Sequence, residues 1–258
     1  MSAEGRARIG ILYPGYGAKD EWLHDDYPRL ADAFVPPVDL HMVHTNPGGW
    51  GVHTIESVKR SGLPENLLPG AEQLKASKVD SCIWACTSGS FTYGLEGARR
   101  QAQKIADVLG VPSSSTSLAF LSALRALDIS RVAIAATYPE ELANAFRTFL
   151  NDGGVDVLHL DSMAIWTGIE ASEMDRERLL GFVRDHTHPD VDAVLVPDTA
   201  LHTVPYLAEL DSEAGKPVLT ANQVTMWEAL RLANRLTRQS GLGQLMATTP
   251  SLPPVSST

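Results

Sequence analysis

Two stretches of this sequence repeat each other, and the repetition limits the folds that the chain can adopt. Residues 79–87 read VDSCIWACT, and residues 191–199 read VDAVLVPDT. Two further matches occur in the same order in both halves, 8–14 with 131–139 and 110–112 with 215–217. Short apolar strands resemble one another by chance, but three matches in one order indicate an internal duplication. We therefore predict two halves of similar architecture.

Short, apolar, β-branched segments alternate with segments of helical periodicity along the whole chain. This alternation predicts parallel sheets covered by helices, with strands buried on both faces. The predicted strands are Arg8–Pro14, Val38–His44, Val79–Thr87, Val111–Thr116, Arg131–Thr137, Val155–Asp161, Ala193–Asp198 and Pro217–Ala221. The clearest predicted helices are Leu95–Leu109, Leu118–Leu127, Glu140–Leu150, Ala171–Asp185 and Val224–Leu236.

Four strands in each half predict an α/β fold of two pseudo-symmetric, doubly wound, parallel four-stranded domains, with the active site between them. The first domain is predicted to span 1–117 and the second 118–221. A C-terminal helix at about 222–246 is expected to cross back onto the first domain. The tail 247–258 is rich in Pro, Ser and Thr, and is predicted to be disordered.

The charge balance excludes several classes of partner. The 258 residues carry a formal net charge of −10, which argues against binding to nucleic acid or to an anionic membrane. No apolar run reaches the ~18 residues of a membrane span, and residues 1–7 lack the apolar core of a signal peptide. The two cysteines, Cys82 and Cys86, provide no disulfide framework. We expect a cytoplasmic protein.

Chemically reactive side chains fall at the carboxyl ends of the predicted strands, where parallel sheets bind their ligands. Cys86 and Asp198 occupy matching positions in the two repeated strands. Tyr138 follows the first strand of the second half, and the loop Pro14-Gly15-Tyr16 follows the first strand of the first half. A thiol facing a carboxylate predicts one acid/base group on each side of a cleft.

The segment Cys86-Thr87-Ser88-Gly89-Ser90 ends a strand and precedes a helix. Its hydroxyls and backbone N–H groups predict a cradle for a carboxylate, which is also expected to lower the pKa of the thiol. The alternative is a buried structural cysteine followed by a polar turn. Cys82, deeper in the same strand, is predicted to be part of the core.

Asp198 has three interpretations: a general base, a partner for a substrate amine, or a cap for a helix after Thr199. His202 is predicted one turn into that helix, where it would orient Asp198 or assist proton transfer, unless it is simply a surface histidine. The histidines at 41, 44 and 53 follow no familiar spacing of metal ligands, so no metal site is expected.

Several segments resemble the arylmalonate decarboxylase and maleate isomerase branch of the Asp/Glu racemase superfamily. The resemblance is carried by residues 9–14, 86–91 with Gly94, 121–127 with 131–133, 135–138 and 227–233, and it covers nearly the whole chain. It implies an enzyme that acts on carbon acids without a cofactor. It also implies that Thr87, Ser88, Tyr138 and backbone amides bind a substrate carboxylate. From their places at the strand ends, we expect Thr199 and the loop Pro14-Gly15-Tyr16 to bind the substrate as well.

The chain departs from the patterns of that branch at two points. Its decarboxylases carry one cysteine, in the second half, whereas its isomerases and racemases carry one in each half. Here the thiol, Cys86, is in the first half, and Asp198 stands where the second cysteine would be. Pro14-Gly15-Tyr16 also replaces an asparagine that binds substrate in the isomerases.

The sequence therefore predicts a decarboxylase of a small malonate-type carboxylate, working through an enediolate that Cys86 protonates. The first alternative is an isomerase or racemase that uses both Cys86 and Asp198. The second is a cysteine-dependent hydrolase or amidase, for which no histidine is evident beside Cys86. A two-lobed binding protein would explain the cradle but not the thiol. The expected partner is a small carboxylate, and a homo-oligomer is compatible with the sequence.

Overall fold

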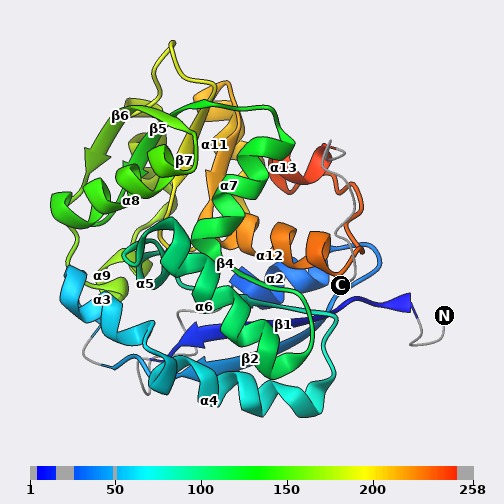
Figure 1. Cartoon of the computed structure of the whole chain (residues 1–258). Helices are drawn as coiled ribbons and strands as arrows, with labels where there is room; N and C mark the ends of the chain where they lie inside the picture. The colour runs from blue at the N-terminus through cyan, green and yellow to red at the C-terminus, as the bar shows by residue number, and fades with distance from the viewer. Residues whose placement is uncertain (1–4, 16–25, 49–50, 249–258) are drawn as a thin grey trace.

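Two four-stranded parallel sheets form the framework of the molecule (Figure 1). The structure is a computed structural model that describes residues 5–15, 26–48 and 51–248. The first sheet has the order β2-β1-β3-β4 and the second β6-β5-β7-β8, so the two share one topology and the predicted fold class is confirmed. The strands are β1 (Arg8–Pro14), β2 (Asp39–Thr45), β3 (Ser81–Trp84), β4 (Ser113–Ser115), β5 (Arg131–Ala136), β6 (Asp156–Ser162), β7 (Ala193–Val196) and β8 (Val218–Thr220).

The repeated strands occupy equivalent places in the two sheets. β3 pairs in parallel with β1, and β7 pairs in parallel with β5. The N–H of Asp80 donates to the Arg8 carbonyl at 2.7 Å, and the N–H of Asp192 donates to the Arg131 carbonyl at 2.8 Å. The same acidic residue therefore begins the same strand pairing in both halves, as the duplication predicts.

Helices cover the sheets on both faces. They are α2 (Asp26–Ala33), α3 (Ile55–Ser61), α4 (Pro64–Leu74), α5 (Ser88–Phe91), α6 (Gly94–Leu109), α7 (Thr116–Ala126), α8 (Glu140–Asp152), α9 (Gly168–Ser172), α10 (Arg176–Asp185), α11 (Leu207–Ala214), α12 (Ala221–Leu232) and α13 (Gly243–Ala247). Two short 3-10 helices, η2 (Lys75–Ser77) and η3 (Val204–Tyr206), complete the described elements.

Two predicted helices differ from the structure. The helix predicted at Ala171–Asp185 is divided, because the Asp175 side chain accepts a hydrogen bond from Arg178 N–H and starts α10 afresh. The helix predicted over 222–246 ends at Leu232, and Asn234 then adopts a positive φ of 53° that an α-helix cannot contain. The predicted tail begins inside α13, and its residues 249–258 lie outside the described part of the chain.

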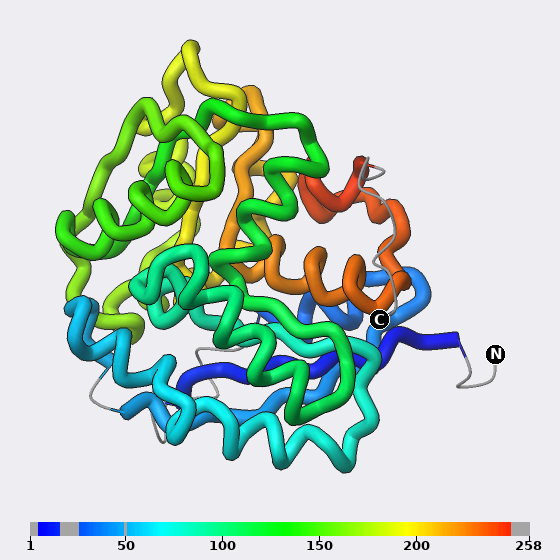
Figure 2. Tube along the Cα trace, in the orientation of Figure 1, coloured from blue at the N-terminus to red at the C-terminus, as the bar shows by residue number. Residues whose placement is uncertain are grey.

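α12 lies between the two sheets, where it packs against α7, β3 and β4 (Figures 1 and 2). It is buried from Ala221 to Leu230, so that even its polar residues need partners inside the protein. Thr225 Oγ1 lies 2.7 Å from Thr116 Oγ1, and the Ala229 carbonyl accepts from Ser81 Oγ at 2.7 Å. The last long helix therefore joins the second half to the first.

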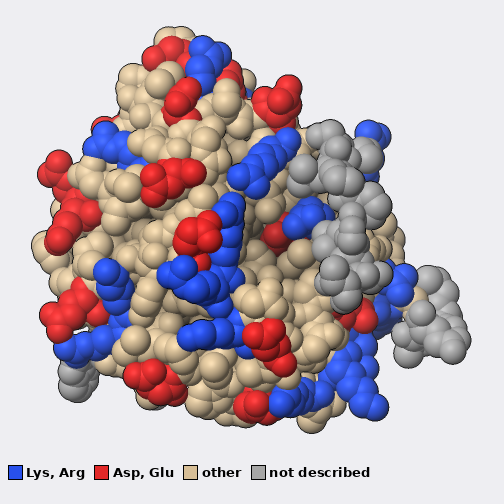
Figure 3. Space-filling model, viewed as in Figure 1, with Lys and Arg blue, Asp and Glu red and all other residues tan. Residues whose placement is uncertain are grey.

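The apolar core continues from one half into the other. A separate, smaller cluster lies against the other face of the first sheet and contains Cys82, Trp84 and Cys86. On the face shown in Figure 3, acidic and basic side chains are intermixed, and several basic ones gather over α6. Among the helices that the structure describes, none combines the length and the apolarity needed to cross a bilayer.

Candidate active site

A cavity lies at the carboxyl ends of the central strands, and both halves contribute to its walls. The predicted site residues that line it are Pro14, Cys86, Ser88, Tyr138, Asp198 and Thr199. Thr87 is buried but is not among the lining residues, and neither are Gly15 and His202. Tyr16 lies outside the described residues. The structure therefore brings the thiol and the carboxylate to one cavity.

The Cys86 thiol is buried, and its sulfur faces hydrogen-bond donors. Gly89 N–H points to Sγ at 3.4 Å, and the hydroxyls of Ser88 and Ser61 lie close enough to lower the thiol pKa. Burial nevertheless outweighs these donors and, with a smaller contribution from Asp198, raises the pKa of Cys86 to about 11. The donors of the predicted cradle lower the thiol pKa as expected, but the loss of water on burial has the larger effect, so the net pKa is raised.

Part of the predicted carboxylate cradle is occupied by protein groups. The N–H groups of Ser90 and Phe91 return to the Thr87 carbonyl at 3.1 and 3.0 Å, as α5 begins. The Ser90 hydroxyl points inward, 2.7 Å from both Ser115 Oγ and Ser117 Oγ. The hydroxyl of Ser88 remains at the cavity wall.

The Asp198 carboxylate is 3% exposed and is held at both oxygens. Thr137 Oγ1 donates to Oδ2 at 2.5 Å, and Ala200 N–H donates to Oδ1 at 2.9 Å. No helix begins directly after Thr199 in this part of the described chain. The chain instead forms a turn there, and the next element, η3, begins at Val204. Asp198 therefore stabilises a turn rather than the start of an α-helix, and this turn keeps its carboxylate at the cavity.

The Tyr138 hydroxyl donates to the Pro197 carbonyl at 2.7 Å. Burial raises its pKa well above the usual value, and Asp198 and Cys86 raise it further. Thr87 Oγ1 has no hydrogen-bond partner of ordinary geometry among the described residues, although it lies near enough to lower the Tyr138 pKa. A buried hydroxyl without a partner is costly, so the position of Thr87 against Tyr138 is an unusual feature of this wall.

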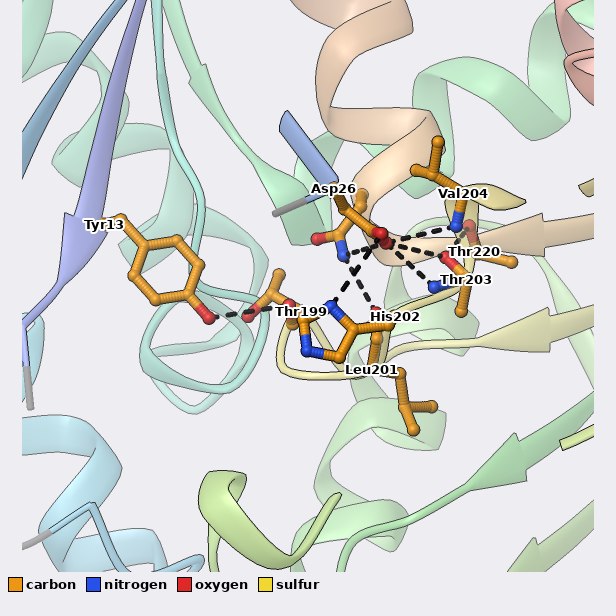
Figure 4. Close-up of polar contacts among 9 residues, drawn as sticks. Tyr13, Asp26, Thr199, Leu201, His202, Thr203, Val204 and Thr220 are labelled. Atoms are coloured by element: carbon orange, nitrogen blue, oxygen red, sulfur yellow. Dashed lines mark hydrogen bonds and ion pairs between the residues drawn. The ribbon is translucent and has the colours of Figure 1, made fainter. Parts of the chain in front are cut away.

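Tyr13 is a cavity residue that the sequence analysis did not single out, although it immediately precedes Pro14. Its hydroxyl lies 3.4 Å from the Thr199 carbonyl (Figure 4). Burial raises its pKa, and Asp198, Cys86 and Asp26 raise it further, so the hydroxyl keeps its proton. The sequence feature that could have identified Tyr13 as a site residue is its position as an aromatic residue at the carboxyl end of β1.

His202 faces Asp26 rather than Asp198 (Figure 4). Its Nδ1 lies 3.9 Å from Asp26 Oδ1, whereas Asp26 Oδ2 accepts hydrogen bonds from Thr203 N–H at 2.8 Å, Val204 N–H at 3.2 Å and Asn222 Nδ2 at 2.9 Å. Burial raises the pKa of Asp26, while these donors lower it. The network joins the start of α2 to the second half, behind the cavity.

The first half also contributes His53, Ser57 and Ser61 to the cavity wall, all of them missed from the sequence. They lie on α3 or on the loop before it, in a segment without a strong strand or helix pattern. Among the residues described, no group of three His, Cys, Asp or Glu side chains is placed to hold a metal ion.

The fold and the cavity define a class of protein: a two-lobed α/β enzyme with a thiol and a carboxylate at the carboxyl ends of equivalent strands. The arylmalonate decarboxylase family model matches residues 34–246, and the chain belongs to this family. The resemblance predicted from the sequence is thus confirmed, and so is the prediction of an enzyme.

Relatives and solved structures agree with this family. The chain is 27% identical to an arylmalonate decarboxylase of Bordetella bronchiseptica, over 86% of this chain and 85% of the relative. It is 22% identical to a maleate isomerase of Geobacillus stearothermophilus, over 93% and 97%. Its fold is similar to a maleate isomerase of Pseudomonas putida S16 solved with maleate, at a TM-score of 0.83 and 20% identity, covering 93% of this chain and 97% of that one.

Proposed function

We propose that the protein removes one carboxylate from a small malonate-type acid, and that the Cys86 thiol then protonates the remaining carbon. The observation that carries this proposal is the burial of the Cys86 thiol in the cavity that Asp198 also lines, and this burial raises the pKa of Cys86 to about 11. A thiol with this pKa keeps its proton at neutral pH and is suited to act as a general acid. Nucleophilic catalysis would instead require the thiolate.

The proposed reaction has two steps. Cleavage of a C–C bond releases carbon dioxide and leaves its electron pair on the α-carbon, where the retained carboxylate delocalises it as an enediolate. The S–H proton of Cys86 then passes to that carbon and forms a C–H bond. The resulting thiolate is stabilised by Gly89 N–H and regains its proton from water. Ser88, which lines the cavity, would hold the retained carboxylate.

Asp198 would act on the carboxylate that leaves. It is a buried acidic residue in the same cavity, and its position is fixed by Thr137 and Ala200. When ionised, Asp198 repels a second carboxylate strongly in a region of low dielectric. Loss of that carboxylate as neutral carbon dioxide relieves the repulsion, so Asp198 favours the cleavage step.

The placement of Cys86 and Asp198 around one cavity also favours a second function, an isomerase or racemase in which both groups carry protons. The relatives include maleate isomerases as well as a decarboxylase. For a hydrolase, His53 is a histidine that lines the same cavity, but its printed contacts are to Ile165 and Tyr138 rather than to Cys86. The raised pKa of the Cys86 thiol opposes the hydrolase function, because a hydrolase needs the thiolate as its nucleophile.

A panel of substrates in heavy water tests the proposal. Purified protein is incubated with substituted malonates, maleate and amino acids, and the products are followed by NMR. We expect a malonate to lose carbon dioxide and to gain one deuterium at the α-carbon, in a single enantiomer. Isomerisation of maleate or racemisation of an amino acid, without release of carbon dioxide from any malonate, would contradict the proposal.

Variants of the two cysteines separate chemistry from folding. Cys86→Ala should abolish turnover while the fold remains, and Cys82→Ala should reduce stability only.

Asp198→Asn should slow decarboxylation without changing the handedness of the product. If Asp198→Asn instead alters the enantiomeric composition, the carboxylate carries a proton, and the isomerase or racemase function is favoured.

A further inference from the structure

His53 belongs to the first half, but the second half holds it in place. Its backbone N–H donates to the Trp166 carbonyl at 2.8 Å, and its ring Nδ1 lies 3.0 Å from the Ile165 carbonyl. The ring also meets the Tyr138 ring edge-on, with centroids 5.1 Å apart. The residue is only 8% exposed, so these contacts fix the orientation of the imidazole.

The bond to Ile165 determines which nitrogen of His53 is free. A carbonyl oxygen only accepts hydrogen bonds, so the proton is assigned to Nδ1. In the neutral ring, Nε2 is then an acceptor. Within the described part of the chain no protein group bonds to Nε2, and His53 lines the cavity.

Ser57 lies four residues further on, on α3, and lines the same cavity. The backbone N–H of Ser57 donates to Thr54 Oγ1 at 3.2 Å, and Thr54 thereby caps the helix. The hydroxyl of Ser57 has no protein partner among the described residues, so it is a free donor. An acceptor and a donor on one wall complement a hydroxyl group, which both donates and accepts.

The charges around the cavity favour a neutral group at this wall. None of the described lining residues is a Lys or an Arg, and the carboxyl group of Asp198 is among them. A further anionic substituent would enter without a cationic side chain to pair with, whereas a hydroxyl needs none.

We propose that His53 and Ser57 form a subsite for a hydroxyl group on the α-substituent of the substrate. This proposal rests on the proposed function and narrows its substrate class to malonates with a hydroxyalkyl substituent. The hydroxyl would donate to His53 Nε2 and accept from Ser57 Oγ. A site built around such bonds discriminates strongly against an analogue that lacks the hydroxyl.

An isosteric pair of compounds tests the subsite: (hydroxymethyl)malonate and ethylmalonate, which differ by a hydroxyl in place of a methyl group. For the wild-type protein we expect kcat/KM to favour the hydroxyl compound by roughly tenfold or more, as one good hydrogen bond allows. His53→Asn keeps a donor for the Ile165 carbonyl but removes Nε2, and Ser57→Ala removes the free hydroxyl. Both should bring the ratio close to one.

Two further variants distinguish recognition from folding. His53→Gln keeps a polar group near the position of Nε2 but loses the bond to Ile165, so it should lower the melting temperature and retain part of the preference. His41→Asn, on β2 and away from the cavity, should leave the ratio unchanged. An unchanged ratio in both His53→Asn and Ser57→Ala would overturn the subsite.

Binding to Cys86→Ala, measured by calorimetry, separates this proposal from the proposed function. If wild type decarboxylates neither compound but the variant binds (hydroxymethyl)malonate more tightly than ethylmalonate, the reaction is wrong and the subsite stands. Equal affinity for the two compounds overturns the subsite, even if both are decarboxylated. Tighter binding of (carboxymethyl)malonate than of the hydroxyl compound overturns the choice of a neutral group.

Discussion

The Cys86 thiol lies in the cavity wall at the end of β3, with Gly89 N–H 3.4 Å from its sulfur. The strand pattern and the following polar segment place the thiol at the site. Its protonation state depends on the balance between three nearby donors and the surrounding protein, which excludes water. Here burial is the largest effect, and it makes the thiol an acid rather than a nucleophile.

The raised pKa of Cys86 predicts a distinctive pH dependence. If the thiol donates a proton, kcat should stay level from pH 7 to about 10 and fall as the pH rises through about 11, because the active, protonated form is then lost. Circular dichroism at each pH would show that the protein remains folded. A rate that instead increases between pH 8 and 9 would mean that the thiolate is the active form.

At the scale of the elements, α5 and the end of α3 form the wall around the sulfur. A Cβ atom at Gly89 would lie 2.6 Å from Trp84 Cη2, 2.8 Å from Ser61 Oγ and 3.0 Å from Cys86 Sγ. These distances are too short for real contacts, so the position requires glycine. The close approach is what lets Gly89 N–H reach the thiol.

Gly89→Ala should therefore displace the sulfur and reduce kcat by roughly 100-fold, since small misplacements in an active site are costly. The overpacking should also destabilise the fold, by about 1–3 kcal/mol. Gly181→Ala on α10 is a matched control, because its Cβ would meet only the end of the flexible Arg184 side chain, at 3.5 Å. Measurements of kcat and of urea unfolding compare the two variants. Normal kcat in Gly89→Ala would show that the position of the sulfur is not critical.

At the scale of the whole molecule, the two halves are held together by α12, by the His53 segment and by Asp26. The antiparallel bridge between Val52 and Thr167 brings α3 and α9 side by side (Figure 1). Asp26 accepts hydrogen bonds from the second half behind the cavity. These contacts hold the two lobes around the cavity.

Asp26→Ala should destabilise the protein by about 3 kcal/mol, because it leaves several buried donors without an acceptor. Asp32→Ala is a suitable control, since Asp32 is exposed on the same helix and should have little effect. Chemical unfolding provides the free energies. Equal stability of the two variants would show that the Asp26 network contributes nothing to the union of the halves.

The sequence by itself indicated eight strands, two halves of one architecture and a site shared by Cys86 and Asp198, because these depend on local apolar patterns and on a duplicated chain, whereas the order of the strands within each sheet came from the structure. The predicted extents of two helices, Ala171–Asp185 and about 222–246, were wrong. The Asp175 side chain starts a new helix within the first, and the positive φ of Asn234 prevents the second from continuing. Only the tertiary structure decided the protonation of the thiol, the partner of His202 and the presence of His53 in the cavity. The burial of the thiol, the pairing of His202 with Asp26 and the bond from His53 to Ile165 all depend on distant segments that folding alone brings together, and no local pattern encodes them.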